Sequence, residues 1–490
     1  MTSRSFDFEK WAPRTDEFVP LIRRFAEHEA LRSATVDELV LGDEFHRRPL
    51  RPEDLSFIDF SRPVTEGNAH QLGFLAAQRL LLSIHELGVA DFPRDSAPET
   101  FSRIAAFYDD EQRVLGARVL PFLEAFSFDF LERAPLAVDI RRGTLVDQLR
   151  QVLSVEAAFW RRALENFGRA SYLEQGLRFS LIQTWSLIDS KRAALGRAAG
   201  ARFFEPLGAE NLPRVIGAMP IDGLVRDVAL RAGVERQAHG YWQFYLSTSL
   251  ASCNWLHALA RRPDRALQLY GAAFVAEAEW LAVGCLAGMA AARFGLEEAR
   301  TPNWGQAVFN DVLDRFERTL SVVEQKWGAR GLVEVASGLS AATALGAVSR
   351  RNLGEQLGWL CSMDAYRDMA ERIDQRIRAE RPDIDRETFV EPREMCSTTH
   401  VHNDHRLVLI ESGNMVFWAN LGMTLRLAPG EMVLVPEGRL HGSSIESPVC
   451  TYHQPIIPEE WVRPLMDELT QGAARERVAD RSALDSAPHV

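Results

Sequence analysis

The chain has 490 residues, of which 46% are hydrophobic and 25% are charged, close to the average for a soluble globular protein. This composition argues against a disordered, collagen-like or membrane-bundle protein. The formal net charge of −12 comes from 56 basic and 68 acidic residues, and no basic block accompanies it, so nucleic acid is not an expected partner. At about 100–200 residues per domain, the length predicts two to four domains.

The cysteine content and the apolar runs bear on the compartment. The five cysteines form no CxxC pair, so we expect a reducing, cytoplasmic setting rather than a disulfide framework. The N-terminal MTSRSFDFEKWAPR is charged and lacks an apolar run, which is not the pattern of a signal peptide. The longest apolar stretch, Leu281–Ala292, is too short to span a bilayer. We therefore expect no membrane partner.

Residues 1 to about 385 are predicted to be helical almost throughout. Apolar residues recur every three or four positions in Gln71–Leu87, Leu145–Phe167, Tyr241–Leu259, Arg265–Phe294 and Val308–Trp327. These segments are rich in Ala, Leu, Arg and Glu, which are good helix formers, and Pro and Gly separate them. The pattern predicts a large helical array with a substantial core.

The pattern changes after Pro382, where short apolar runs of period two alternate with Gly and Asn turns. The candidate strands are Leu407–Ile410, Met415–Ala419, Thr424–Leu427, Met432–Val435 and Thr451–Ile457. Short strands at this spacing predict a small β-barrel over residues 386–470. Residues 471–490 are polar and are predicted to form a flexible tail.

Histidines gather in this strand-rich region. The chain has 12 histidines, and five of them fall between residues 390 and 455: His400, His402, His405, His441 and His453. His400 and His402 are two apart, so on a strand both rings point to the same face and can reach one metal ion.

Two spacings in this region match the signatures of the cupin barrels. Gly430, Pro436, Gly438 and His441 fit the second signature, G-x5-P-x-G-x2-H. The first signature fits from the His-x-His pair to Gly413, except at one position. The family normally has Glu there, and this chain has Arg406, which cannot be a ligand because it stays protonated and has no free lone pair.

The cupin resemblance implies a catalytic metal site formed by His400, His402 and His441. Imidazole suits Fe, Zn, Cu or Ni, so the ligand set alone does not choose the metal. The alternative is a cupin scaffold whose histidines are satisfied by hydrogen bonds. Arg406 is a candidate for binding a substrate carboxylate, the alternative being an outward salt bridge, and His453 is a second candidate for contact with substrate.

His405 has two interpretations: its side chain is exposed to solvent, or it supports the metal ligands. We expect the side chain to be exposed.

A helical half followed by a three-His cupin resembles the N-nitrosourea-forming iron enzymes of streptozotocin biosynthesis and their relatives. The stretches that carry the resemblance are Ala76–Leu82, His239–Leu246, Gln356–Trp359, Val390–Arg393, Thr399–His402 and Arg439–Glu446. That family has an N-terminal helical dimerisation region, a haem-oxygenase-like helical bundle with a di-iron centre, and a C-terminal cupin. The resemblance implies such domains at 1–135, 136–385 and 386–470, and a homodimer.

The resemblance also implies a function. In that family the central domain hydroxylates guanidine nitrogens of an arginine derivative, and the cupin iron then rearranges the product oxidatively to join two nitrogens. We expect one Fe(II) per chain in the cupin, O₂ as co-substrate, and an N-hydroxylated, arginine-like amino acid supplied by a separate N-hydroxylase. The expected product is an N-nitroso or diazeniumdiolate compound of specialised metabolism. The alternatives are a three-His dioxygenase acting on another small amino acid, and a non-catalytic ligand-binding cupin that partners an active relative.

The central region departs from the family's pattern. A di-iron site needs about six Glu, Asp and His ligands on facing helices, yet residues 100–390 contain only two histidines, His239 and His257. Glu277 and Glu174 stand at or near ligand positions. The other positions hold Asn211, Trp304, Val308 and Asp311. We therefore expect that the central domain lacks a di-iron centre and that Glu277 and Glu174 are its remnants.

Overall fold

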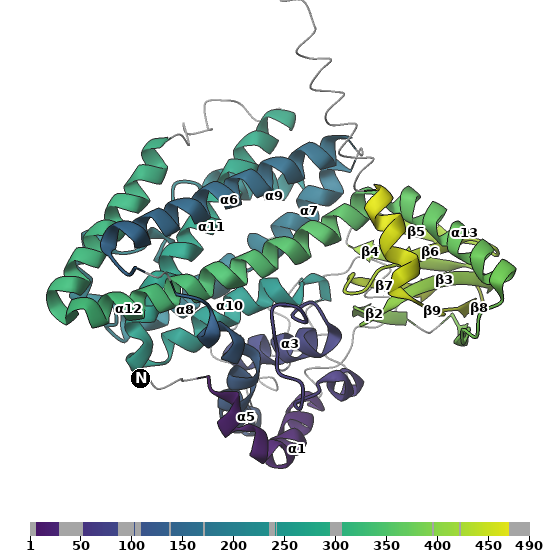
Figure 1. Ribbon diagram of the computed structural model, residues 1–490, viewed down its shortest axis with the longest axis horizontal. Helices are drawn as coiled ribbons and strands as arrows, with labels where there is room; N and C mark the ends of the chain where they lie inside the picture. Colours follow the sequence, from purple (N-terminus) through teal and green to yellow (C-terminus); the bar gives the residue numbers. More distant parts are fainter. Residues whose placement is uncertain are drawn as a thin grey trace, which may run out of the picture. The chain divides into compact units, whose positions relative to one another are not determined.

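The computed structural model describes residues 6–28, 52–86, 102, 109–136, 139–169, 172–234, 241, 243–294, 306–393, 396–420 and 423–469. The chain divides into two compact units, Met1–Leu357 and Gly358–Val490. The first is helical, and the second contains the strands together with α13 (Figure 1). The predicted flexible tail, 471–490, lies outside the described residues.

The first unit consists of α-helices joined by short 3₁₀ turns. The helices are α1 (Thr15–Ala26), α3 (Leu72–Glu86), α5 (Asp110–Phe128), α6 (Arg142–Arg169), α7 (Leu173–Thr184), α8 (Ile188–Gly200), α9 (Asp222–Arg231), α10 (Ser247–Ala260), α11 (Ala266–Arg293) and α12 (Gln306–Cys361). The last residues of α12 belong to the second unit. The predicted helical region is confirmed, although α10 begins six residues later than its apolar pattern indicated.

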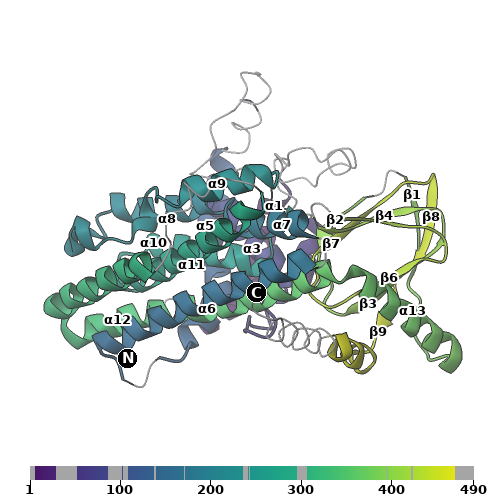
Figure 2. The ribbon, with the colours of Figure 1, turned by 90° about the horizontal axis from the view of Figure 1, so that it is seen from above.

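The core of the first unit lies around α11. Figure 2 shows α6, α11 and α12 side by side. Two glycines allow the close approach of α11 and α12, because a Cβ at Gly271 would lie 2.3 Å from the Val335 carbonyl oxygen and one at Gly338 would lie 1.9 Å from that of Gln268. The most apolar windows of these two helices are long and apolar enough to span a membrane, but 78% and 61% of them are buried. Their apolar residues therefore form the core of the helical unit.

The second unit contains two antiparallel sheets. Its strands are β1 (Thr388–Pro392), β2 (Cys396–His400), β3 (His405–Ser412), β4 (Met415–Asn420), β5 (Met423–Leu427), β6 (Met432–Val435), β7 (His441–Ile445), β8 (Val449–His453) and β9 (Ile456–Ile457). One sheet has the order β1-β8-β3-β6, with β9 also paired to β3, and the other has the order β2-β7-β4-β5. Helix α13 (Met363–Glu380), which precedes the predicted boundary at residue 385, packs against β6.

A small β domain after a helical region was predicted and is confirmed, but its strands do not close into a single barrel. Among the described residues, no backbone pairing joins an edge strand of one sheet to an edge strand of the other. Alternating apolar residues specify one buried face per strand, and a sandwich and a barrel share that pattern. The sequence pattern therefore predicts the strands but not their closure.

The three glycines of the cupin signatures adopt a left-handed backbone. Gly413, Gly430 and Gly438 have φ values of 82°, 86° and 73°, a region that residues with a Cβ rarely enter. At Gly413 an added Cβ would also lie 2.3 Å from the Val449 carbonyl oxygen. The signature spacing thus reflects backbone conformations that only glycine adopts at low cost.

Candidate functional site

The three predicted ligands lie together in the second unit. The donor atoms of His400, His402 and His441 all lie within 4.8 Å of one another. The ring centroids are 4.9 Å apart for His400 and His402, 4.6 Å for His400 and His441, and 4.9 Å for His402 and His441. Among the described residues, this is the group of His, Cys, Asp or Glu side chains that could hold a metal ion.

Strand pairing brings the two sequence motifs into contact. His400 ends β2 and His441 begins β7, and the two residues are directly opposite each other in the antiparallel pair, which places their side chains on the same face. His402 lies two residues beyond the end of β2, and its carbonyl oxygen accepts a hydrogen bond of 2.9 Å from the Gly438 N–H. The expectation that both histidines of the pair lie on a strand is therefore wrong for His402, because the chain leaves the sheet at Val401.

The hydrogen bonds of the histidines fit a metal-binding role. His441 Nδ1–H donates to the Arg439 carbonyl oxygen at 2.8 Å, which leaves the Nε2 lone pair available. Within the described part of the chain, the buried Nε2 atoms of His402 and His441 have no hydrogen-bond partner. A buried polar atom without a partner is costly, and a bound metal ion would satisfy both nitrogens. The residues present therefore fit a metal ion.

Burial keeps these imidazoles neutral. Desolvation and the neighbouring His400 lower the pKa of His441 to about 3. Desolvation, followed by the nearby His441 and His400, lowers the pKa of His402 far below its usual range. Neutral imidazole is the form that binds a metal, so both side chains are ready to act as ligands at neutral pH.

Aromatic side chains hold the His441 ring in place. Phe417 on β4 stacks on it with a centroid distance of 5.3 Å and an interplanar angle of 21°. Trp359 lies edge-on at 6.5 Å, and its own Nε1–H donates to the Leu434 carbonyl oxygen at 3.2 Å. The sequence did not identify Phe417 or Trp359 as part of the site, because single aromatic residues in apolar segments cannot be distinguished from ordinary core residues.

Arg406 is held by groups of the chain itself. Its guanidinium forms ion pairs with Asp404 and Glu387 and donates to the Gln454 carbonyl oxygen at 3.0 Å. It also lies close enough to His402 to contribute to the lowering of that residue's pKa. A role for Arg406 in binding a substrate carboxylate stays a prediction.

His453 is buried on β8. Its ring is hydrogen-bonded at Nδ1 to the Thr388 hydroxyl at 2.9 Å, and its Nε2 lies 3.4 Å from Glu411 Oε2. Thr388 on β1 is its direct register partner, so the ring connects two strands of the five-stranded sheet. Contact between His453 and a substrate stays a prediction.

His405 was expected to be exposed, and this is wrong because the structure buries it. Its Nδ1 accepts a hydrogen bond of 3.0 Å from the Glu437 N–H, and its Nε2–H donates to the Glu459 carboxylate. The pKa of Glu459 is lowered mainly by this hydrogen bond. His405 therefore ties the loop of the second signature to residue 459, a role that its position beside the His-x-His pair did not show.

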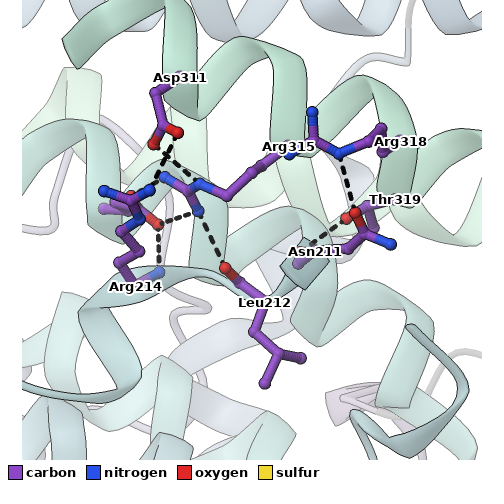
Figure 3. Close-up of polar contacts among 8 residues, drawn as sticks. Asn211, Leu212, Arg214, Asp311, Arg315, Arg318 and Thr319 are labelled. Carbon is purple, nitrogen blue, oxygen red and sulfur yellow. Dashed lines mark hydrogen bonds and ion pairs between the residues drawn. The ribbon is translucent and has the colours of Figure 1, made fainter. Parts of the chain in front are cut away.

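In the helical unit, Glu277 is bound by an arginine. It is buried on α11 and forms an ion pair with Arg315 of α12, while its Oε2 accepts a hydrogen bond of 2.7 Å from the Arg214 N–H. Arg315 also donates to Asp311 at 3.0 Å and to the Leu212 carbonyl oxygen at 2.9 Å (Figure 3). The guanidinium thus provides the positive charge beside the Glu277 carboxylate.

Of the other positions considered for di-iron ligands, the structure also describes Asn211, Val308 and Glu174. Asn211 accepts a hydrogen bond from Arg318 (Figure 3) and donates one to the Leu207 carbonyl oxygen. Val308 is half-buried. Glu174 is exposed in the first turn of α7. Trp304 and His239 lie outside the described residues. These contacts agree with the predicted loss of the di-iron centre, which stays a prediction.

The structure describes four cysteine side chains. Cys253, Cys285, Cys361 and Cys450 are free thiols. A cytoplasmic location itself stays a prediction.

Comparison with known proteins identifies one informative relative. The chain is 25% identical over 436 residues to a nitrosourea synthase from Streptomyces achromogenes subsp. streptozoticus, and this match covers 84% of the chain and 89% of the relative. No family model matches the chain. Together with the mostly helical architecture followed by antiparallel strands, this relative confirms that the chain resembles the nitrosourea-forming enzymes along most of its length.

Proposed function

We propose that the chain is a non-haem Fe(II) oxidoreductase that uses O₂ to form an N–N bond. Its substrate would be an N-hydroxylated, arginine-like amino acid made by a separate N-hydroxylase. Its product would be an N-nitroso or diazeniumdiolate compound of a specialised metabolic pathway. The reaction would take place at His400, His402 and His441 in the second unit.

The proposal rests on three imidazoles that lie close together. Not all of their nitrogen lone pairs accept hydrogen bonds within the protein. The donor atoms of the three histidines lie within 4.8 Å of one another, and the Nε2 atoms of His402 and His441 are buried without a hydrogen-bond partner in the described structure. The similarity to a nitrosourea synthase over most of the chain supports N–N bond formation over other reactions of three-His sites.

The chain's own residues set the conditions for this chemistry. Fe(II) bound by three neutral imidazoles would keep its full positive charge and open positions, and would supply the redox chemistry with O₂. The Arg439 carbonyl oxygen fixes the His441 tautomer, and Phe417 and Trp359 fix the plane of its ring. Fixing a ligand in this way keeps the open positions of the metal in one place for a substrate.

The helical unit supports the assignment of a single metal site. Glu277 is paired with Arg315, and Asn211 and Val308 stand at further ligand positions of the central domain. With this site lacking a metal, hydroxylation of the guanidine would have to occur on another protein. This is why the proposed substrate already carries the N-hydroxyl group.

The test is anaerobic loading with Fe(II), followed by O₂ and a panel of arginines hydroxylated at the guanidine nitrogens and labelled with ¹⁵N. Mass spectrometry should show a product in which two labelled nitrogens are directly bonded, together with O₂ consumption. The matched control is the variant His402→Ala, which should bind no iron and form no product.

Two outcomes would contradict the proposal. O₂ consumption with a different small amino acid and no N–N product would indicate a three-His dioxygenase. Tight binding of an amino acid without O₂ consumption would indicate a non-catalytic partner of an active relative.

A further inference from the structure

A cavity lies within the helical unit, between α6, α7, α8, α10, α11 and α12. The centre of a water molecule can reach about 70 Å³ of it. At roughly 10–15 Å³ for each water centre, this space holds about five to seven waters, or roughly 150–200 Å³ of liquid. A free amino acid is of this size.

Four charged side chains line the cavity, two of each sign. Glu156 pairs with Arg350, and Glu279 lies 3.5 Å from Lys191. Glu156 is almost fully buried, whereas the exposed fractions of the Lys191, Glu279 and Arg350 side chains are 16%, 22% and 18%. Burial and the neighbouring Glu279 raise the pKa of Glu156 to about 7. The two carboxylates therefore repel each other despite their cationic partners, and a further positive group between them would be favourable.

Gly346 lies at the meeting point of these charges. An atom at its missing Cβ position would lie 3.0 Å from Glu279 Oε1, 3.4 Å from Arg350 Nη1 and 3.7 Å from Glu156 Oε1. Gly346 lies inside the helix α12, where glycine is usually unfavourable, and its backbone does not require positive φ. A molecule bound beside Gly346 would therefore meet two carboxylates and a guanidinium at once.

A narrower apolar space adjoins the cavity. The two share Ser252, Ala276, Glu279 and Gly346. The narrower part is lined mainly by apolar side chains, among them Leu256, Val275 and Leu345. A molecule that places its charged groups beside Glu279 can therefore extend an apolar side chain away from them.

The cavity is separate from the Glu277–Arg315 pair. Glu277 and Glu279 both lie on α11, but residues two apart in an α-helix point about 200° away from each other. Glu277 is satisfied by Arg315 and Arg214, whereas Glu279 faces the cavity. The cavity is thus not a remnant of the ligand set that surrounds Glu277.

We propose that this cavity is a binding site for a free α-amino acid with an apolar side chain. The ammonium group of the amino acid would lie between Glu156 and Glu279, and its carboxylate would meet Lys191 and Arg350. The apolar side chain would extend toward the narrower space beside Gly346. This site is independent of the metal and of the reaction proposed for the histidines.

The experiment is titration of the metal-free full-length protein with L-leucine, followed by calorimetry and by tryptophan fluorescence. Fluorescence reports on the site because Trp160 and Trp280 line the cavity. Two analogues each lack one charge: isoamylamine has no carboxylate, and isocaproate has no ammonium. L-Leucine should bind with a saturable signal, at least tenfold more tightly than either analogue.

Two variants locate the binding. Gly346→Ala keeps all four charges and places a methyl group at the meeting point, so it should weaken L-leucine binding at least tenfold. Its control is Gly358→Ala on the same helix, where an added Cβ meets no atom within 4 Å. Glu279→Gln should also weaken binding at least tenfold, whereas Glu165→Gln, exposed on α6, should not change it.

The proposal is overturned if L-leucine gives no saturable signal, if the two analogues bind as tightly as L-leucine, or if Gly346→Ala binds it as tightly as the unaltered chain. Binding should persist in His402→Ala. Loss of binding in that variant would place the amino acid at the histidines and would likewise overturn the proposal, whereas failure of the N–N reaction leaves this result unaffected.

Discussion

Two clusters of potential metal ligands in this chain have opposite hydrogen-bonding states. At His400, His402 and His441, the donor atoms converge, and two buried nitrogens have no partner among the described residues. At Glu277, both carboxylate oxygens receive donors, from the Arg315 side chain and the Arg214 backbone. The first cluster is chemically incomplete without an ion, whereas the second is already complete.

This difference shows that a buried carboxylate at a position expected to hold a metal ligand can be satisfied by groups of the chain itself. A buried carboxylate needs a positive partner, and Arg315 provides one from within the chain. The guanidinium donates several hydrogen bonds in fixed directions, and it also reaches Asp311 and the Leu212 carbonyl oxygen. In identifying a metal site, the types of residue present are therefore weaker evidence than whether their lone pairs already accept hydrogen bonds from the protein.

The largest expected effect comes from breaking the histidine cluster. His402→Ala removes one of three ligands, and we expect iron to fall from about one equivalent to near zero per chain, with product formation lowered more than about 100-fold. Elemental analysis and product mass spectrometry measure these two effects. Retention of one equivalent of iron in His402→Ala would locate the metal elsewhere in the chain.

The next largest effect is expected at the second cluster. Arg315→Met leaves the Glu277 carboxylate buried without its cation and should lower the free energy of unfolding by about 3–5 kcal/mol. Urea unfolding followed by circular dichroism measures this change. Arg330→Met, at an exposed site on the same helix, should change it by less than about 0.5 kcal/mol.

The double variant Glu277→Leu, Arg315→Met sharpens this test. It removes both charges, and we expect it to recover most of the stability that Arg315→Met alone loses. No loss in Arg315→Met would show that the Glu277 carboxylate does not depend on Arg315.

An intermediate effect is expected from pH in the metal-free protein. His441 has a pKa of about 3 when folded and about 6.5 when unfolded, so between these values the unfolded chain binds more protons. Stability contributed by the neutral ring is therefore complete above pH 6.5 and falls as the pH decreases toward 3, by about 1.4 kcal/mol per pH unit. Urea unfolding at pH 7, 6 and 5 measures this slope.

The variant His441→Asn should reduce that slope of stability against pH by the contribution of one proton, about 1.4 kcal/mol per pH unit. His257 of the helical unit has the same lowered pKa of about 3, caused first by burial, so His257→Gln should reduce it similarly. An unchanged slope in His441→Asn would mean that the ring is not buried in the metal-free protein.

The smallest effect is expected from the turn that supports the histidines. Gly438→Ala places a Cβ at a φ of 73° and should cost about 1–2 kcal/mol of stability. Iron affinity should weaken several-fold, because the Gly438 N–H holds the His402 carbonyl oxygen. Gly143→Ala, where the added methyl meets no atom within 4 Å, should lower neither quantity in the same assays.

Much of the site could be predicted from the sequence because its geometry is local. Gly430, Gly438 and His441 are linked by a turn of fixed length, and His400 and His402 by a short spacing. His405 and Arg406 were harder, because their partners come from distant parts of the chain: Glu459 for His405 and Glu387 for Arg406. Side-chain pairing across such distances leaves no spacing signal in a single sequence.

Prediction of the fold from the sequence has the same limit. Helices such as α6 and α11 were predicted because their apolar periodicity is continuous over many residues. Strands β1, β2 and β7 were not, because they are short and contain few apolar residues in alternation. Whether the strands form two sheets or one barrel depends on how their edges meet, which a local pattern does not encode.

The placement of the three ligands has a consequence for the evolution of the chain. All three come from β2, the residues just after it, and β7, which are neighbours in one sheet. The other sheet, β1-β8-β3-β6, provides none of them. Substitutions on that second sheet therefore leave the three imidazoles and the strand pair that carries them unchanged, so the chain can vary there without altering the histidine cluster.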